Sequence, residues 1–271
     1  IQNYNNIMYK LPSFFCPKWK TKLIRLGQPN DGGYCIPEKS LDETNILFSF
    51  GLDDNWSFEE HFQKKSRAKI ICFDKNVNNK FWIKKILKGI IYFNFKKNFF
   101  KQFINFFLYF KYKKFVQQKN VYHIKKHINP NNMIVAKSTM ENFINLQDIL
   151  KDWGDNSFFL KMDIEGNEYN ILNDIIKHQK NMIGMVIEFH SCDLMFEKIK
   201  AFIEKLNLDL VHIHINNYGS VTKDQFPTVI ELTFSAKKYN LKREENENNF
   251  PVDSLDEPNN KNDEDDPIFF I

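Results

Sequence analysis

Acidic and imidazole side chains stand directly after two apolar runs in the second half of the chain. Asp163 and Glu165 follow residues 158–162, and Glu188 and His190 lie at the end of the next run. Carboxylates beside an imidazole can bind a positive group or take a proton from a hydroxyl. We expect His190 to be the catalytic base, because imidazole titrates near neutral pH, with Asp163 and Glu165 as the other catalytic residues.

The same groups also form a candidate metal site. Side chains alternate along a strand, so Glu188 and His190 share one face, beside Asp163 on the neighbouring strand. Oxygen-rich sets of this kind suit a hard divalent cation, Mg²⁺ or Mn²⁺, which would lower the pKa of a bound hydroxyl. We therefore keep a cation held by Asp163, Glu188 and His190 as a second expectation.

Two earlier apolar runs end in residues that suit a cofactor. Gly51 follows residues 46–50 and would let a ligand approach the backbone closely, and Asp74 ends the run 69–73, where its carboxylate could accept both hydroxyl protons of a ribose. An ordinary turn and a helix cap are the alternatives for these two residues. The chain lacks the G-x-G-x-x-G pattern of dinucleotide sites, which disfavours a nucleotide-dependent oxidoreductase.

These residues are positioned by alternating strand and helix patterns, which are typical of a parallel sheet covered by helices. The seven predicted strands are 46–50, 69–73, 133–136, 158–162, 185–189, 210–215 and 229–234, with helices near 56–66, within 80–118, and near 141–152, 167–178 and 194–206. Too few residues separate the last two strands for a helix, so they form an antiparallel hairpin. The predicted fold is an α/β, Rossmann-like, mostly parallel seven-stranded sheet of the class I methyltransferase layout.

The predicted organisation is a lead-in over 1–45, a catalytic domain over 46–240 and an acidic tail over 241–271. Within the domain, residues 80–127 hold 13 lysines, many aromatic residues and no acidic residue, whereas the whole chain has a net charge of only +4. This insertion is either an ordinary amphipathic helical segment or an arm that contacts phosphate groups or an anionic membrane surface. It carries no signature of a nucleic-acid-binding motif, so we expect no nucleic-acid partner.

Two further histidines have open roles. His212 and His214 share one face of the strand 210–215, and Asn216 and Asn217 follow it. The four residues could help to place an acceptor, or the histidines could be hydrogen-bonded core residues. The four cysteines lack CxxC spacing, which is typical of a reducing compartment, so we expect a cytoplasmic protein; the sequence does not indicate its oligomeric state.

Taken together, the strand-end motifs resemble the FkbM-type methyltransferases. The similar segments are RLG (25–27), DGGY (31–34), SFG (49–51), WSFE (56–59), FD (73–74), LKMDIEG (160–166), IEFH (187–190), HIHINNYG (212–219) and LDEPNN (255–260). The resemblance implies an S-adenosylmethionine-dependent O-methyltransferase, with Gly51, Asp74, Asp163 and Asp31 at the cofactor. It also implies a small acceptor such as a sugar or nucleotide-activated sugar used in surface glycans.

The sequence departs from this family at two places. Asp53 stands where relatives often have a second glycine, and the insertion 80–127 has no counterpart. Besides the Rossmann-type oxidoreductase, a non-catalytic binding module with a methyltransferase fold remains as an alternative function.

Overall fold

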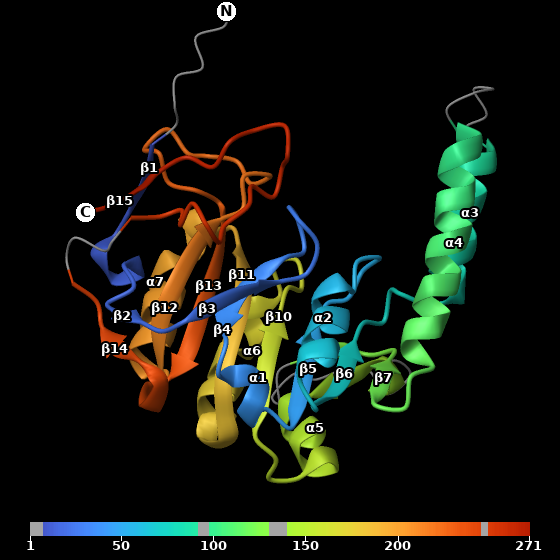
Figure 1. Cartoon of the computed structure of the whole chain (residues 1–271), viewed down its shortest axis with the longest axis horizontal. Helices are drawn as coiled ribbons and strands as arrows, with labels where there is room; N and C mark the ends of the chain where they lie inside the picture. The colour runs from blue at the N-terminus through green and yellow to red at the C-terminus, as the bar shows by residue number, and fades with distance from the viewer. Residues whose placement is uncertain (1–7, 92–97, 130–139, 245–248) are drawn as a thin grey trace, which may run out of the picture.

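The structure is a computed structural model that describes residues 8–91, 98–129, 140–244 and 249–271. Its centre is a seven-stranded sheet in the order β12-β13-β11-β10-β5-β6-β7 (Figure 1). The strands are β5 (Ile46–Phe50), β6 (Lys69–Phe73), β7 (Val121–Ile124), β10 (Phe158–Met162), β11 (Met182–His190), β12 (Leu208–Ile215) and β13 (Val229–Ala236).

Within this sheet, β13 runs antiparallel to both of its neighbours, and the other adjacent pairs are parallel. The last two strands in the chain therefore form the predicted hairpin, with β13 inserted next to β11. This confirms the predicted Rossmann-like class I methyltransferase fold. The strand order reverses between β5 and β10, and open parallel sheets bind their ligands at the carboxyl ends of the strands at such a point.

The third strand of the sheet lies elsewhere than predicted. It is β7, which falls inside the range assigned to the basic insertion, whereas the predicted strand 133–136 lies outside the described residues. Strand β7 is a four-residue edge strand in which Val121 is buried and Tyr122 is exposed. Its short, partly polar sequence gives a weak strand signal beside the long helical pattern that precedes it.

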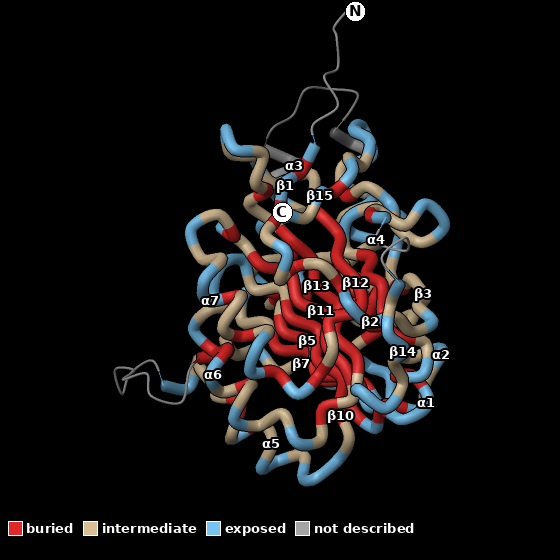
Figure 2. The backbone as a smooth tube through the Cα atoms, turned by 90° about the vertical axis from the view of Figure 1, so that its left-hand side faces the viewer, coloured by how far each residue is buried: buried red, intermediate tan, exposed pale blue. Residues whose placement is uncertain are grey.

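Helices cover the two faces of the sheet, as the alternating pattern predicts. The helices α5 (Leu146–Trp153), α6 (Glu168–His178) and α7 (Cys192–Lys205) contribute to the core on one face, and α2 (Ser57–Lys65) and the hairpin of β3 (Leu23–Leu26) and β4 (Tyr34–Pro37) cover the other. The strands between them are almost entirely buried (Figure 2). Burial on both faces explains why the parallel strands are continuous apolar runs instead of alternating ones.

Smaller elements complete the chain. These are strands β1 (Tyr9–Leu11), β2 (Trp19–Lys20), β8 (His127–Asn129), β9 (Phe143–Asn145), β14 (Leu241–Lys242) and β15 (Ile268–Phe270), helix α1 (Ser40–Glu43), and 3₁₀ turns at Ser13–Phe15, Met140–Asn142, Gln179–Asn181 and Lys237–Tyr239. Among the described residues, no helix is long and apolar enough to cross a membrane.

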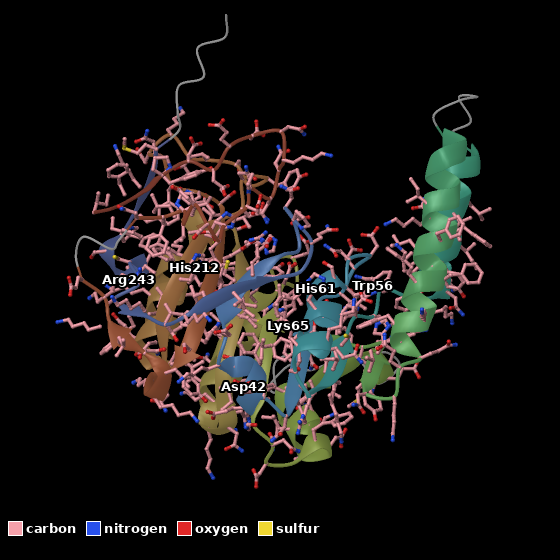
Figure 3. All side chains as sticks on the ribbon, viewed as in Figure 1. Asp42, Trp56, His61, Lys65, His212 and Arg243 are labelled. Atoms are coloured by element: carbon pink, nitrogen blue, oxygen red, sulfur yellow. The ribbon has the colours of Figure 1, made fainter. Side chains whose placement is uncertain are left out.

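Helices α3 (Asn79–Ile91) and α4 (Asn98–Val116) pair with each other and stand away from the β7 edge of the sheet (Figure 1). Their inner faces carry aromatic residues: Trp82 lies 5.3 Å from Tyr112 between ring centroids, and Phe115 stacks on Trp56 at 6.1 Å. In Figure 3, Trp56 lies near the helical pair, and His212 lies toward the opposite edge of the sheet. The insertion is thus anchored at its base by an aromatic cluster.

The C-terminal residues 249–271, here called the strap, fold back over the β12 side of the sheet. Strand β15 pairs with β1 near the start of the chain. His212 Nε2 lies 3.1 Å from Asp256 Oδ2, and His214 Nε2 lies 2.9 Å from Asp265 Oδ2. Both histidines are buried, so they anchor the strap as hydrogen-bonded core residues, which was one of the two interpretations of the sequence.

This anchoring makes the stability of the protein depend on pH through His214. Burial alone would lower the pKa of His214, but hydrogen bonds to Asp265 and Glu231 raise it to about 10. A histidine with a raised pKa stabilises the folded state fully below its unfolded pKa, roughly 6.5, and this contribution is lost as the pH rises through the folded value. The free energy of unfolding should therefore fall from about pH 6.5 to about 10, by at most roughly 1.4 kcal/mol per pH unit from this residue.

Urea denaturation at a series of pH values measures this slope. The His214→Gln protein should lose the His214 part of the slope, whereas Lys261→Ala, an exposed change in the same strap, should keep it. Equal slopes in the wild-type and His214→Gln proteins would contradict the assignment.

Candidate active site

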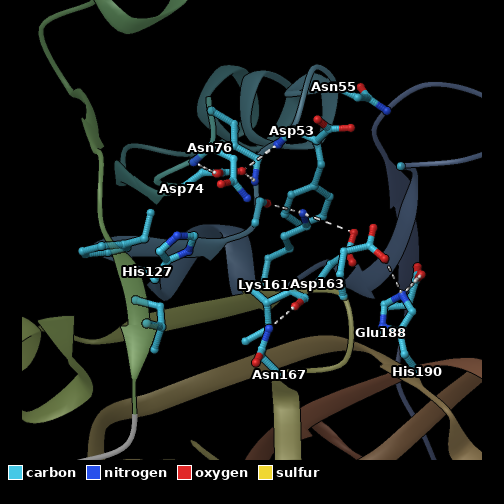
Figure 4. Close-up of a pocket in the computed structure, with 18 of the residues that line it drawn as sticks. Asp53, Asn55, Asp74, Asn76, His127, Lys161, Asp163, Asn167, Glu188 and His190 are labelled. Atoms are coloured by element: carbon cyan, nitrogen blue, oxygen red, sulfur yellow. Dashed lines mark hydrogen bonds and ion pairs between the residues drawn. The ribbon is translucent and has the colours of Figure 1, made fainter. Parts of the chain in front are cut away.

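A pocket of about 980 Å³ opens at the carboxyl ends of β5, β6, β10 and β11, where the strand order reverses. Predicted site residues Asp31, Gly51, Asp74, Asp163, Glu165, Glu188, His190 and Asn216 line it. Figure 4 shows two groups in its wall, with Asp53, Asp74 and Asn76 on one side and Asp163, Glu188 and His190 on another. Eight of the predicted site residues therefore lie in the wall of one pocket.

Gly51 is required by the close packing of two strand ends. Its φ is +84°, and a Cβ atom there would lie 1.7 Å from the backbone oxygen of Asp163. No other residue fits without moving a backbone, so this is more than an ordinary turn. Two residues later, Asp53 has a φ of +44°, in the left-handed region that glycine prefers and aspartate tolerates. Asp53 thus adopts a backbone conformation that a glycine at this position could also adopt.

Asp74 links the loop after β5 to the loop after β6. Its Oδ2 accepts hydrogen bonds from the backbone N–H groups of Leu52 and Asp53, both at 3.1 Å, and its Oδ1 accepts from those of Asn76 at 2.7 Å and Val77 at 3.3 Å. A carboxylate has about four acceptor positions, so these bonds use its capacity. Asp74 holds both loops in place, and its contact with a ribose remains a prediction that requires some of these bonds to be exchanged.

Lys161 and Tyr34 are site residues that the sequence reasoning missed. The buried Lys161 ammonium donates to the Gly51 carbonyl at 2.7 Å and lies 3.9 Å from both Glu59 Oε1 and Asp163 Oδ2. The Tyr34 hydroxyl donates to Asp163 Oδ2 at 2.9 Å. A lysine inside the apolar run of β10 was the available signal, because a buried ammonium needs a carboxylate partner.

The two carboxylate oxygens of Asp163 have different surroundings. Its Oδ2 receives the Tyr34 hydroxyl and the Lys161 charge. Its Oδ1 is buried and has no hydrogen-bond partner among the described residues. Asp163 lines the pocket, and a carboxylate oxygen without a partner can accept a proton or a hydrogen bond from a ligand.

His190 is surrounded by three carboxylates. Its Nδ1 lies 3.2 Å from Glu168 Oε1, and its Nε2 lies 3.3 Å from Glu188 Oε1 and 3.4 Å from Glu165 Oε2. Burial alone would lower the pKa of His190, but the hydrogen bonds to Glu168 and Glu188 raise it to about 11. A histidine that is protonated at neutral pH cannot take a proton, so this geometry argues against the predicted role of His190 as the base.

Comparison with known proteins relates one segment of the chain to a protein family. Residues 143–210 match the family model described as the methyltransferase FkbM domain, and this segment contains Asp163, Glu165, Glu188 and His190. Over this segment the chain resembles the FkbM-type methyltransferases. It is an S-adenosylmethionine-dependent methyltransferase, and the oxidoreductase and binding-module alternatives are set aside.

Several solved structures are similar to this chain, three of which follow. M. capricolum TrmK in complex with S-adenosyl-homocysteine is 11% identical, with 80% of this chain and 74% of that chain covered and a TM-score of 0.36. The precorrin-6y C5,15-methyltransferase of Geobacter metallireducens is 12% identical (74% and 86% covered, TM-score 0.35), and M. jannaschii TYW2 in complex with AdoMet is 13% identical (73% and 74%, TM-score 0.35). Similarity at this level carries no weight for the fold or the function. No curated protein sequence matches the chain.

A cation in this methyltransferase would meet a slightly different set of ligands than predicted. Asp163, Glu165 and His190 offer atoms that lie within 4.8 Å of one another. Glu188, the predicted third ligand, instead accepts a hydrogen bond from Asn216 Nδ2 at 3.2 Å and contacts His190. Glu165 therefore takes the place of Glu188 in the candidate set.

The four residues predicted to bind the acceptor lie in two places, the pocket and the contacts with the strap. Asn216 lines the pocket, whereas Asn217 accepts the backbone N–H of Asn260 at 2.6 Å and so belongs to the strap contacts with His212 and His214. Tyr218, exposed at the pocket mouth, also lines the wall. Of the four predicted acceptor residues, the methyltransferase thus brings only Asn216 to the pocket.

Asp31 reaches the pocket wall from the lead-in and is tied to the strap. Its Oδ1 accepts a hydrogen bond from Asn259 Nδ2 at 3.4 Å, and the same amide donates to Glu231 Oε1 at 2.9 Å. Burial raises the pKa of Asp31, and the hydrogen bond from Asn259 opposes this rise. The strap therefore positions part of the pocket of the methyltransferase.

Proposed function

We propose that this methyltransferase methylates a hydroxyl oxygen of a sugar or nucleotide-activated sugar. The observation that carries this proposal is the Asp163 carboxylate, which lines the pocket and whose Oδ1 has no hydrogen-bond partner among the described residues. Carboxylate and amide side chains make up 14 of the 30 lining residues, including Asp31, Asn55 and Asn76. Such groups match the many hydroxyls of a sugar, and use in surface glycan synthesis within the cytoplasm is part of the same proposal.

The residues at the carboxyl ends of the strands fit S-adenosylmethionine. The bound cofactor would supply a methyl group on a positively charged sulfur. Gly51 lets the ends of β5 and β10 approach each other closely at the pocket, and Asp163 and Glu165 bring carboxylates to the same place. Gly51, Asp74 and Asp31 would hold this group, with Asp74 acting through the loops that it connects.

We infer that Asp163 takes the proton of the acceptor hydroxyl. Tyr34 and Lys161 fix its Oδ2, so Oδ1 keeps one orientation without needing a ligand to order it. A positioned general base of this kind contributes about 10² to 10⁴ to a rate. Methyl transfer otherwise depends on alignment of the acceptor oxygen with the methyl group, which the rigid strand ends provide.

His190 then acts as a positioning residue. As a cation it bridges Glu168 in the buried first turn of α6 to Glu165 and Glu188 at the pocket. It also balances part of the negative charge that these groups bring together. Glu165, with a positive φ of 56° and an exposed side chain, is the other carboxylate in reach of an acceptor.

A cation-assisted reaction is the second candidate. The observation that favours it is the convergence of Asp163, Glu165 and His190 within 4.8 Å. Mg²⁺ or Mn²⁺ held there would activate the hydroxyl as a Lewis acid. Activity that survives exhaustive chelation would exclude this candidate and leave Asp163 as the base.

The acceptor is tested by incubating the purified protein and S-adenosylmethionine with panels of nucleotide sugars, oligosaccharides and, as comparison classes, amines and RNA. We expect mass spectrometry to detect a one-methyl gain on a sugar hydroxyl. A gain confined to amines or RNA would contradict the proposed acceptor class while leaving the methyltransferase assignment intact.

A further inference from the structure

Among the side chains that the structure describes, those on the outer faces of the helical pair α3–α4 belong neither to the hydrophobic core nor to the pocket wall. The inner faces pack on each other through Trp82, Tyr109 and Tyr112, and Asn105 Nδ2 donates to the Lys85 carbonyl at 3.2 Å. The pair projects from the body of the molecule, so its outer faces meet solvent along their described length (Figure 1).

Large apolar side chains are concentrated on these outer faces. On α4, Phe106, Phe107 and Phe110 are 48%, 60% and 52% exposed, and the rings of Phe106 and Phe110 lie 4.7 Å apart. On α3, Ile83 and Leu87 are also exposed, one helical turn apart. Soluble proteins rarely leave a contiguous apolar group of this kind uncovered, so it indicates a contact surface.

Lysines flank the same apolar side chains. Lys111 and Lys114 follow Phe107 and Phe110 at four residues, and Lys80 and Lys84 lie on the exposed side of α3 beside Ile83; all four lysines are exposed. The whole stretch 80–127 contains no acidic residue. Exposed phenylalanines among lysines, with no compensating carboxylate, are the composition of helices that lie on anionic membranes.

We propose that the outer faces of α3 and α4 dock on the surface of an anionic lipid membrane. The lysines attract the charged headgroups, and the phenylalanines with Ile83 and Leu87 enter the boundary between headgroups and acyl chains. A second copy of the chain is disfavoured as the occupant because it would bring lysine against lysine. A nucleic acid is disfavoured because the charges are lysines, not arginines, and because Ile83 and Leu87 beside the phenylalanines cannot stack on bases.

Docking in this way would bring the pocket close to the membrane. Lys85 of α3 forms an ion pair with Asp54, and Asp54 lines the pocket. The base of the helical pair therefore adjoins the pocket mouth. A membrane-bound arm would hold the enzyme with its pocket near the lipid surface, whatever its acceptor is.

Co-sedimentation of the full-length protein with vesicles tests the proposal. We expect binding to vesicles of phosphatidylcholine mixed with phosphatidylglycerol, weak binding to phosphatidylcholine alone, and loss of binding as salt is raised. The triple variant Phe106→Ser, Phe107→Ser, Phe110→Ser should bind the anionic vesicles at least about tenfold more weakly. The double variant Lys111→Gln, Lys114→Gln should also bind about tenfold more weakly, with the largest difference at low salt.

Matched controls carry the same chemical changes elsewhere. Leu194→Ser removes a 76% exposed apolar residue on α7, and Lys237→Gln removes a surface lysine near β13; both should bind like the wild type. Circular dichroism confirms that each variant is folded. The proposal is wrong if the wild type does not bind anionic vesicles, if the triple variant binds as well as the controls, or if the protein binds RNA or self-associates through these faces instead.

Discussion

The Asp163→Asn enzyme should turn over about 10² to 10⁴ times more slowly than the wild type, because the amide cannot take the acceptor proton. The substitution keeps the shape of the side chain, and its carbonyl oxygen can still accept the Tyr34 hydroxyl that now bonds to Oδ2. Affinity for S-adenosylhomocysteine should therefore fall by no more than about tenfold, roughly 1.4 kcal/mol. Steady-state kinetics with saturating S-adenosylmethionine, together with calorimetry, measures the two effects separately.

Glu165→Gln is the matched control, because it makes the same chemical change on the neighbouring pocket carboxylate. We expect it to retain activity within about tenfold of the wild type. An inactive Glu165→Gln enzyme beside an active Asp163→Asn enzyme would move the base to Glu165.

Gly51→Ala should abolish measurable binding of the cofactor. The added Cβ would lie 1.7 Å from the Asp163 carbonyl oxygen, so either β5 or β10 must shift at its carboxyl end, and the φ of +84° adds strain. Because Asp163 N–H also bonds to the Phe50 carbonyl at 2.9 Å, the shift separates the two strand ends that form the pocket. Calorimetric titration with S-adenosylhomocysteine measures the loss.

The Gly154→Ala protein is the control that distinguishes the effect of this clash from the effect of a positive φ. Gly154 has a φ of +69° but meets only the side chain of Asn156, at 3.8 Å, and it lies outside the pocket wall. The control should lose about 1 to 3 kcal/mol of stability and bind the ligand normally. Wild-type affinity in a folded Gly51→Ala protein would show that these strand ends are not the cofactor site.

The sheet and much of the pocket wall could be predicted because they depend on local patterns. Continuous apolar runs mark strands buried on both faces, and the polar residue that follows each run must lie at the same sheet edge. Asp163, Gly51 and His190 were found in this way. Strand β7 was missed because a short edge strand buries little and so shows little apolar pattern.

The chemical roles were harder to predict because they depend on contacts between distant segments. His190 is favoured as a base by its ordinary pKa, yet Glu168 reaches it from α6 and, together with Glu188 of its own strand, raises that pKa. The histidines of β12 were similarly ambiguous until the strap placed Asp256 and Asp265 beside them. The spacing of residues within one segment cannot predict such contacts between segments.

The glycine at the end of β5 shows the opposite case, in which the structure sharpens a weak sequence signal. One glycine after a strand is common in turns, but the 1.7 Å clash with Asp163 shows that this position admits no side chain. The close approach joins residues 51 and 163, and only the parallel pairing of β5 with β10 brings them together.

Calorimetric titration of the purified wild-type protein with S-adenosylhomocysteine tests the central claim most directly. We expect a single saturable site for S-adenosylhomocysteine that is lost in the Gly51→Ala protein and kept in the Gly154→Ala protein. Absence of binding to the wild type, or equal binding by all three proteins, would contradict the assignment of this pocket as the methyl-donor site.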